Sequence, residues 1–171
     1  DDEPYEFFAV ELSSFQLHWT YSLSPYASVV LNIAEDHVDW HGSFERYKAD
    51  KARVYEHTQV ACIFNTDHVD TLRMVENADV IEGARAIGFS STEMPAVSML
   101  GLAEDIMVDR AFLKNRYNEA YELAVLEDLA PAPGKMPAKH TVENALAAAA
   151  LCRAADIDPK AVGAGLRSFK T

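Results

Sequence analysis

The sequence predicts an α/β fold with a mostly parallel sheet flanked by helices. Three short apolar runs, residues 7–10, 29–33 and 60–64, are aromatic or β-branched and end in polar residues, as buried strands do. Segments of helical character separate these runs, and such alternation is typical of parallel sheets. We expect a single domain, because 171 residues with 49% apolar content suffice for one core.

Two helices are predicted between these strands. The first covers residues 15–23 and must end before Pro25, because the residue that precedes a proline is kept out of the helical region. The second runs to Tyr55 and begins after Ser43, whose hydroxyl suits an N-cap.

Polar side chains follow each of the three predicted strands. Glu11 follows the first, the acids and imidazole of residues 35–37 follow the second, and residues 65–67 follow the third. In open parallel sheets, ligands bind outside the carboxyl ends of the strands. The sequence therefore predicts a site at this edge.

Lys51 lies on the apolar stripe of the second helix, together with Phe44, Tyr47, Val54 and Tyr55. One interpretation is that its stem packs while its ammonium reaches the rim or pairs with an acid. The other is a desolvated amine, whose neutral form is accessible and can react or be modified.

His37 also has two interpretations. A lone histidine after a strand can simply be hydrogen-bonded, but carboxylates at the same edge favour a hard cation held by carboxylate and imidazole. His37 and His41 are four residues apart, as in helical zinc hydrolases. Val38 stands where that motif has its glutamate, and Gly42 disfavours a long helix, so zinc hydrolysis is the weaker hypothesis.

The second half of the chain predicts a smaller antiparallel element and two helices. Strands are expected at residues 85–89, 105–108 and 124–126, with a solvated turn at residues 109–116. A loop at residues 131–135 leads to a helix that starts near His140. Its buried stripe is predicted to comprise Val142, Ala145, Leu146, Ala149 and Cys152. Asp158 and Pro159 fit the cap and first position of a last helix.

Charge and cysteine content exclude several classes of protein. A net charge of −12 argues against a nucleic-acid or anionic-membrane partner, which would require clustered basic residues. Cys62 and Cys152 lack metal-type spacing, so both are expected to be buried free thiols of a reducing compartment. No signal peptide or long apolar span is visible, and we therefore expect a soluble cytoplasmic protein.

Four strings together resemble the central, mononucleotide-binding domain of the Mur ligases. They are ELSSFQL from Glu11, LNIAEDHVDWH from Leu31, YKADKARVY from Tyr47 and HTVENALAAAALC from His140. The first is the most specific, and it points to the branch of the family that adds D-glutamate to UDP-N-acetylmuramoyl-L-alanine in peptidoglycan synthesis. The resemblance implies ATP and Mg²⁺ or Mn²⁺ as cofactors, and an acyl phosphate as the intermediate.

The resemblance also implies roles for particular residues. Glu11 and His37 match metal ligands, and Lys51 matches a lysine that becomes a carbamate and helps to hold a second metal ion, with Lys51 and His37 catalytic. Ser13 and Gln16 match positions that contact the muramoyl nucleotide.

The adenine side of the ATP site is implied at the start of the helix near His140. There His140 and Asn144 match the family pattern of a histidine and two asparagines, whereas Thr141 replaces the first asparagine and puts one contact in doubt.

The family's phosphate-binding loop, with glycines and a lysine followed by serine or threonine, does not occur in this sequence. We therefore expect residues 1–171 to be an incomplete central domain, inactive alone and monomeric when completed. The alternative is a noncatalytic relative that acts as a binding module. The joint presence of Glu11, His37 and Lys51 argues against it, because a scaffold needs none of them.

Overall fold

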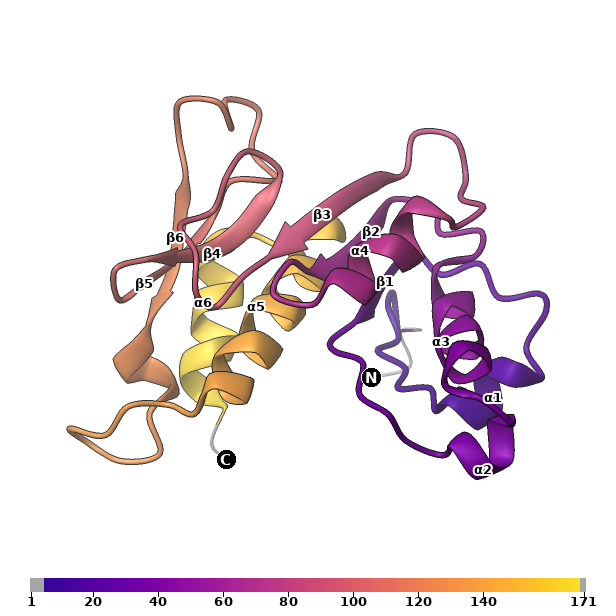
Figure 1. Cartoon of the computed structure of the whole chain (residues 1–171). Helices are drawn as coiled ribbons and strands as arrows, with labels where there is room; N and C mark the ends of the chain where they lie inside the picture. The colour runs from indigo at the N-terminus through magenta and orange to yellow at the C-terminus, as the bar shows by residue number, and fades with distance from the viewer. Residues whose placement is uncertain (1–4, 170–171) are drawn as a thin grey trace.

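One mixed sheet of six strands organises the computed structural model, which describes residues 5–169 (Figure 1). The strands lie in the order β1-β2-β3-β4-β5-β6. The first four pair in parallel, and the last two join by antiparallel pairing. Their bounds are Ala27–Val30 (β1), Ala61–Asn65 (β2), Arg85–Phe89 (β3), Met99–Ala103 (β4), Ile106–Asp109 (β5) and Tyr121–Val125 (β6). The predicted fold class is confirmed, including its small antiparallel element.

Helices cover both faces of the parallel part of the sheet. The α-helices are Ser14–His18 (α1), Val38–His41 (α2), Phe44–Ala52 (α3), Val69–Glu76 (α4), Lys139–Ala154 (α5) and Pro159–Ser168 (α6), with single 3₁₀ turns at Arg53–Tyr55 (η1) and Leu126–Leu129 (η2). The helices α1, α2 and α3 lie together at one end of the molecule, whereas α5 and α6 lie beneath the sheet (Figure 1).

The core has two parts because β2 is buried on both faces. Ile63 of β2 packs with Ile87 and Leu146 on the α5 face. Cys62 packs with Tyr55 and Met74 on the other face, which η1 and α4 cover. Burial on both faces explains why the strand reads as a continuous apolar run.

Tyr55 links β1 to β2 inside the second core. Its hydroxyl donates to the carbonyl of Ile63 at 2.7 Å and accepts the N–H of Val30 at 2.9 Å. Burial raises the pKa of the Tyr55 hydroxyl, so it stays protonated and able to donate.

The predicted first strand is wrong. Residues 7–10 form no strand, and Phe7, Phe8 and Val10 are exposed. The described part of the chain gives this segment no neighbouring strand, because β1 pairs only with β2. Extended backbone needs a partner for its N–H and C=O groups before it becomes a strand, and an apolar run alone does not supply one.

Several predicted boundaries need correction. The helix expected over residues 15–23 ends at His18, where the N–H of Trp19 bonds back to the carbonyl of Gln16. The strand β4 was not predicted, and β6 starts three residues before the predicted strand at residue 124. The Ser43 cap is confirmed by its bond from the N–H of Arg46 at 3.2 Å, and Asp158 caps α6.

Two predictions about which side chains are buried are also wrong. Asp109, expected in a solvated turn, is fully buried and paired with Arg153 of α5 at 2.9 Å. Cys152 is exposed rather than part of the buried stripe, although Cys62 is buried as predicted. Within residues 5–169, no helix has the length and apolar character needed to span a membrane.

Candidate active site

A network centred on Asp67 occupies the carboxyl edge of the parallel strands, as predicted for residues 65–67. Asp67 lies just beyond β2, and its carboxylate accepts hydroxyl hydrogens from Ser90 at 2.8 Å, Thr92 at 2.9 Å and Ser91 at 3.2 Å. These three residues follow β3 directly. The Asp67 network therefore ties together the loops that leave two neighbouring strands.

The hydrogen bonds decide the charge of Asp67. Burial favours the neutral acid, but the bonds from Ser90, Thr92 and Ser91 outweigh burial and lower the pKa of Asp67 below its ordinary value. The carboxylate is thus ionised under ordinary conditions, and it stabilises the folded state in that form.

Replacing Asp67 with asparagine is expected to weaken the acid sensitivity of folding. A lowered folded-state pKa adds stability above the unfolded value of about 3.9, and this stability is lost as the pH falls through the folded pKa. The difference in unfolding free energy between wild type and Asp67→Asn should therefore be constant near neutral pH and shrink as the pH falls from the unfolded pKa of about 3.9 through the lower folded pKa. Urea denaturation at several pH values measures it, with exposed Asp39→Asn as control. A difference that is constant with pH would contradict this assignment.

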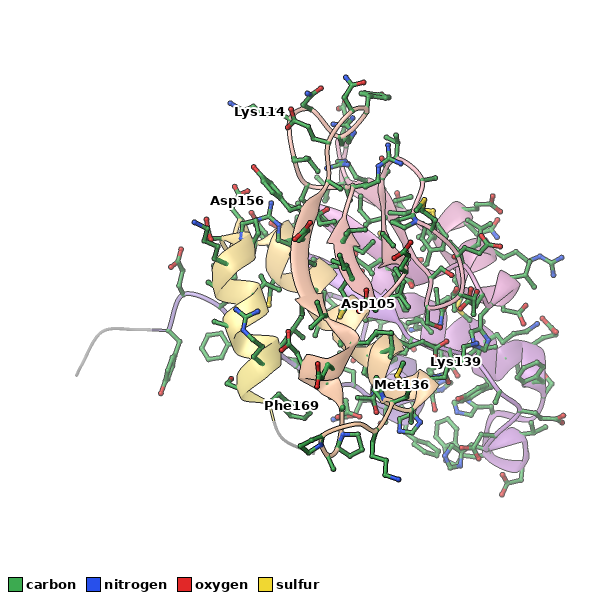
Figure 2. The ribbon with its side chains drawn as sticks, turned by 90° about the vertical axis from the view of Figure 1, so that its left-hand side faces the viewer. Asp105, Lys114, Met136, Lys139, Asp156 and Phe169 are labelled. Atoms are coloured by element: carbon green, nitrogen blue, oxygen red, sulfur yellow. The ribbon has the colours of Figure 1, made fainter. Side chains whose placement is uncertain are left out.

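Glu143 of α5 extends the network. It is 7% exposed, and it accepts bonds of 3.4 Å from Asn65, from the hydroxyl of Ser91 and from the ammonium of Lys139. Lys139 is the first residue of α5, just after the loop that carries Met136 (Figure 2). Glu143 thus fixes the start of α5 against the carboxyl edge.

The three residues predicted for the adenine side lie in the first turns of α5. His140 and Asn144 are exposed and four residues apart, which places them on one helix face, and Thr141 is half-buried. Among residues 5–169, none of their side chains has a hydrogen-bond partner. They share the start of α5 with Lys139 and Glu143, which do join the Asp67 network.

Glu11, His37 and Lys51 lie on three separate segments, before α1, at the start of α2 and within α3. Glu11 is exposed, three residues before α1. His37 is the N-cap of α2 with a left-handed backbone, φ 50°, which is costly for a residue other than glycine and recurs at functional sites. Its ring lies 4.8 Å from that of Phe15 in α1. No hydrogen bond or ion pair joins the three side chains among residues 5–169, and Glu11 no longer follows a strand, because residues 7–10 form none. Their joint role as ligands stays a prediction.

Lys51 has no acidic partner in the described part of the chain. Its neighbour on α3, Lys48, bonds to Glu45 at 2.8 Å and lies 3.4 Å from Asp70, whereas Lys51 is half-buried and makes no ion pair among residues 5–169. An ion pair with an acid is therefore not seen for Lys51 within residues 5–169. The interpretations in which its ammonium reaches the rim, or its amine is desolvated and reactive, stay predictions.

Ser13 and Gln16, predicted to contact the substrate, form a capping box at the start of α1. The Ser13 hydroxyl accepts the N–H of Gln16 at 3.3 Å, and the Gln16 side chain accepts the N–H of Ser13 at 2.9 Å. Both residues are exposed, so their outer atoms can still meet a ligand.

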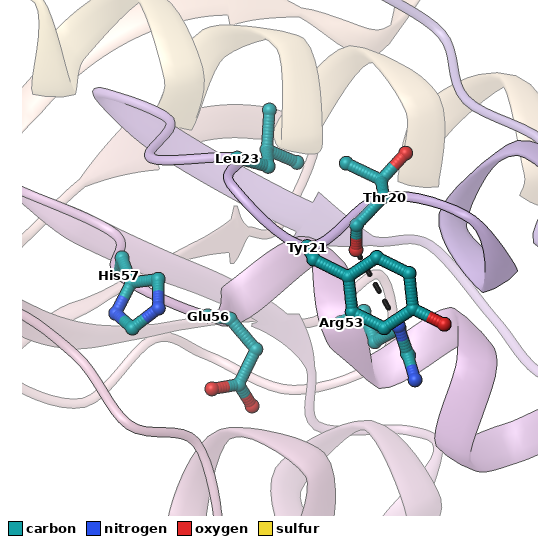
Figure 3. Close-up of a pocket in the computed structure, with 6 residues that line it drawn as sticks. All are labelled: Thr20, Tyr21, Leu23, Arg53, Glu56 and His57. Carbon is teal, nitrogen blue, oxygen red and sulfur yellow. Dashed lines mark hydrogen bonds between the residues drawn. The ribbon is translucent and has the colours of Figure 1, made fainter.

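A cavity of about 330 Å³ lies at the opposite end of the strands (Figure 3). It is lined by Thr20, Tyr21, Leu23, Arg53, Glu56 and His57, which precede β1 and β2. The Arg53 guanidinium lies over the Tyr21 ring and donates to the carbonyl of Thr20, so its charge is already engaged. None of the residues predicted for the site lines this cavity.

Sequence reasoning missed part of the network. Ser90, Ser91 and Thr92 follow a correctly predicted strand, and the same rule that selected residues 65–67 would have found them. Glu143 lies within the string that contains His140, Thr141 and Asn144. Only the fold shows that its side chain joins the Asp67 network at the carboxyl edge of the sheet.

A parallel sheet with helices on both faces and polar loops at its carboxyl edge defines the class of nucleotide-binding α/β domains. Residues 1–152 match the family model described as the Mur ligase middle domain. The chain therefore belongs to the Mur ligase family.

Curated relatives extend the match over nearly the whole chain. UDP-N-acetylmuramoylalanine--D-glutamate ligase of Streptomyces avermitilis is 51% identical over 169 residues, which are 99% of this chain and 35% of the relative. The enzyme of that name from Leifsonia xyli is 49% identical over 99% of this chain and 33% of its own length. The chain thus spans about a third of these relatives.

A solved structure supports the fold. UDP-N-acetylmuramoyl-L-alanyl-D-glutamate--2,6-diaminopimelate ligase superimposes with a TM-score of 0.64 at 18% identity, over 92% of this chain and 31% of that chain. At this identity the likeness concerns the fold alone.

Proposed function

We propose that this chain is the central domain of an ATP-dependent ligase that joins D-glutamate to UDP-N-acetylmuramoyl-L-alanine during peptidoglycan synthesis in the cytoplasm. The observation that carries the proposal is the 49–51% identity, over nearly all of this chain, to relatives with that name. Because the chain covers about a third of them, we propose that it does not turn over alone. We also propose that the complete ligase is a monomer.

The proposed reaction forms an amide bond in two steps. The γ-phosphoryl group of ATP passes to a carboxylate oxygen of the muramoyl substrate, and ADP leaves. The amino nitrogen of D-glutamate then attacks the acyl carbon, loses a proton, and displaces inorganic phosphate. Such chemistry depends mainly on positioning and on stabilising the charge of the phosphoryl group.

Mg²⁺ and Mn²⁺ prefer oxygen ligands, which Glu11 and a carbamate on Lys51 would offer. Glu11 offers a carboxylate, His37 an imidazole, and the half-buried Lys51 an amine without an acidic partner in the described chain. When bound, the metal would neutralise charge on the transferring phosphoryl group. The neutral amine of Lys51 attacks carbon dioxide, forms an N–C bond and loses a proton, and the carbamate then offers oxygen ligands.

The remaining proposed roles belong to residues at the starts of α5 and α1. His140, Thr141 and Asn144 contact the adenine side of ATP from the first turns of α5, which Glu143 holds in place. Ser13 and Gln16 contact the muramoyl nucleotide from the start of α1. With a net charge of −12, the chain itself supplies little attraction for nucleotides or nucleic acids, so we propose that bound metal provides part of the positive charge.

A hybrid ligase tests these roles. In it, this chain replaces the matching third of the Streptomyces avermitilis relative. Replacing Glu11 with glutamine in this hybrid is expected to raise the Mg²⁺ concentration for half-maximal phosphate release by about tenfold or more, because a neutral amide is a poorer metal ligand. A Mg²⁺ titration of the initial rate measures this change.

The control is Glu6→Gln, the same substitution at an exposed position five residues earlier. It should leave the Mg²⁺ requirement unchanged. If Glu11→Gln behaves as this control does, Glu11 is not a metal ligand.

A further inference from the structure

A buried polar network joins α1, α2 and α3. We call it the Asp50 network, and its members are Ser14, His18, His41 and Asp50. One carboxylate oxygen of Asp50, Oδ2, lies 2.7 Å from Nδ1 of His41 and 2.9 Å from Nδ1 of His18. The other ring nitrogen of His41, Nε2, lies 3.0 Å from the hydroxyl of Ser14.

The network is deep in the structure. The side chain of His41 is fully buried, and that of Asp50 is 10% exposed. The His41 ring also contacts Phe15 at 5.5 Å and Tyr47 at 5.3 Å between centroids. In such an apolar setting a satisfied hydrogen bond is strong, and an unsatisfied one is costly.

A carboxylate only accepts, so both Nδ1 atoms donate to Asp50. The third hydrogen bond joins Nε2 of His41 to the Ser14 hydroxyl, and either group can be its donor. Both ring nitrogens of His41 therefore have a partner.

Two other interpretations fit less well. Ligands of a tetrahedral zinc ion with bonds of about 2.0–2.1 Å lie about 3.3 Å apart, whereas the N···O distances here are those of hydrogen bonds. Ser14, His41 and Asp50 also follow the order of a nucleophilic triad. Ser14 is only 5% exposed, however, and does not line the cavity of Figure 3, so no substrate can reach it there.

The placement of the network suggests its purpose. Ser14 begins α1 three residues after Glu11, His41 ends the helix that His37 caps, and Asp50 directly precedes Lys51. The helices α1 and α2 have only five and four residues, and helices this short do not hold their position without tertiary contacts.

We propose that Asp50 is a positioning residue, which through His41 and His18 holds Glu11, His37 and Lys51 in the mutual arrangement that binds metal. This inference rests on the proposed function, because it assumes that these three residues form the metal site. It assigns to Asp50, His41 and His18 a task that involves no contact with the metal.

The test measures Mn²⁺ binding to the folded chain. Calorimetry gives the affinity, and the broadening of backbone amide NMR signals shows which residues lie near the bound ion. Asp50→Ala removes the shared acceptor and should weaken Mn²⁺ binding by about 10- to 100-fold, as supporting partners of metal ligands do. Asp50→Asn removes the same charge but keeps an oxygen that accepts both N–H groups, so it should bind nearly as wild type. Glu45→Ala, an exposed acid on α3, is the control.

The outcomes separate the claims. Wild-type affinity in Asp50→Ala would overturn the inference and leave the metal site standing. Equal losses of affinity in Asp50→Ala and Asp50→Asn would do the same, because the lost negative charge would then account for the whole effect. A wild-type chain without Mn²⁺ binding would overturn the proposed metal site and this inference with it. If Asp50→Ala does not fold, His18→Ala replaces it, because His18 is at the half-buried end of the network. His18→Ala is expected to weaken Mn²⁺ binding, and an unchanged Mn²⁺ affinity would contradict the inference.

Discussion

Replacing Lys51 with arginine is expected to lower the turnover of the hybrid ligase by about 10²-fold or more. Metal stabilisation of a phosphoryl group contributes several kcal/mol, and each 1.36 kcal/mol is about tenfold in rate. Arginine keeps the positive charge and much of the length of lysine, but its guanidinium does not lose a proton in proteins. It therefore cannot add carbon dioxide, and the carbamate oxygens are missing.

Two measurements check this result. Phosphate release gives the turnover, and ¹³C NMR in labelled bicarbonate should show a carbamate signal in wild type that is absent from Lys51→Arg. Lys48→Arg is the matched control, because Lys48 lies on the same helix and pairs with Glu45 and Asp70, which arginine can also do. Unchanged turnover in Lys51→Arg would refute the carbamate.

Replacing Asp109 with alanine is expected to lower the free energy of unfolding by about 3–5 kcal/mol, the cost of breaking a buried ion pair. The Asp109 carboxylate accepts from Arg153 at 2.9 Å and from the N–H groups of Ala111 at 2.7 Å and Phe112 at 2.9 Å. Without this carboxylate, the charge of the Arg153 side chain, which is only 6% exposed, would have no acidic partner. A domain of this kind has only about 5–15 kcal/mol in total, so much of its stability depends on this pair.

Urea denaturation monitored by circular dichroism measures the loss. Asp105→Ala, at the exposed hairpin turn between β4 and β5, makes the same substitution and should change stability by less than about 0.5 kcal/mol (Figure 2). The double variant Asp109→Leu with Arg153→Met should recover part of the loss, because it leaves no charge buried. A loss below about 1 kcal/mol in Asp109→Ala would contradict the role of the pair.

Local patterns were sufficient for β2 and β3, the two central strands of the parallel part. Residues 60–64 form a continuous apolar run because β2 is buried on both faces, and both features follow from position in the sheet. The Ser43 and Asp158 caps were likewise predictable, because each depends on residues within one helical turn.

Long-range pairing was not predictable in the same way. Residues 7–10 resemble a strand as closely as residues 29–33 do, yet only the latter overlap one, β1, which begins two residues earlier and ends at Val30. Among the described residues, β1 has a neighbouring strand and residues 7–10 have none. Asp109 sits beside basic residues in the sequence, and its true partner, Arg153, is 44 positions away.

The candidate site was predictable to the extent that strand ends define it. That rule selected Asp67 together with Glu11 and His37, although the strand expected before Glu11 does not form. The metal roles of Glu11, His37 and Lys51 followed from the family resemblance. The Asp50 network could not be predicted, because nothing in the local pattern relates Ser14, His18, His41 and Asp50. Their connection arises from the packing of α1 and α2 on α3.

The most direct test of the proposed function is phosphate release from ATP by the hybrid ligase, supplied with Mg²⁺, UDP-N-acetylmuramoyl-L-alanine and D-glutamate. We predict release that requires both substrates, and none from the isolated chain or with L-glutamate in place of D-glutamate. A folded hybrid that releases no phosphate, while the parent enzyme does under the same conditions, would contradict the account. It would leave the chain a nucleotide-domain relative that binds without catalysis.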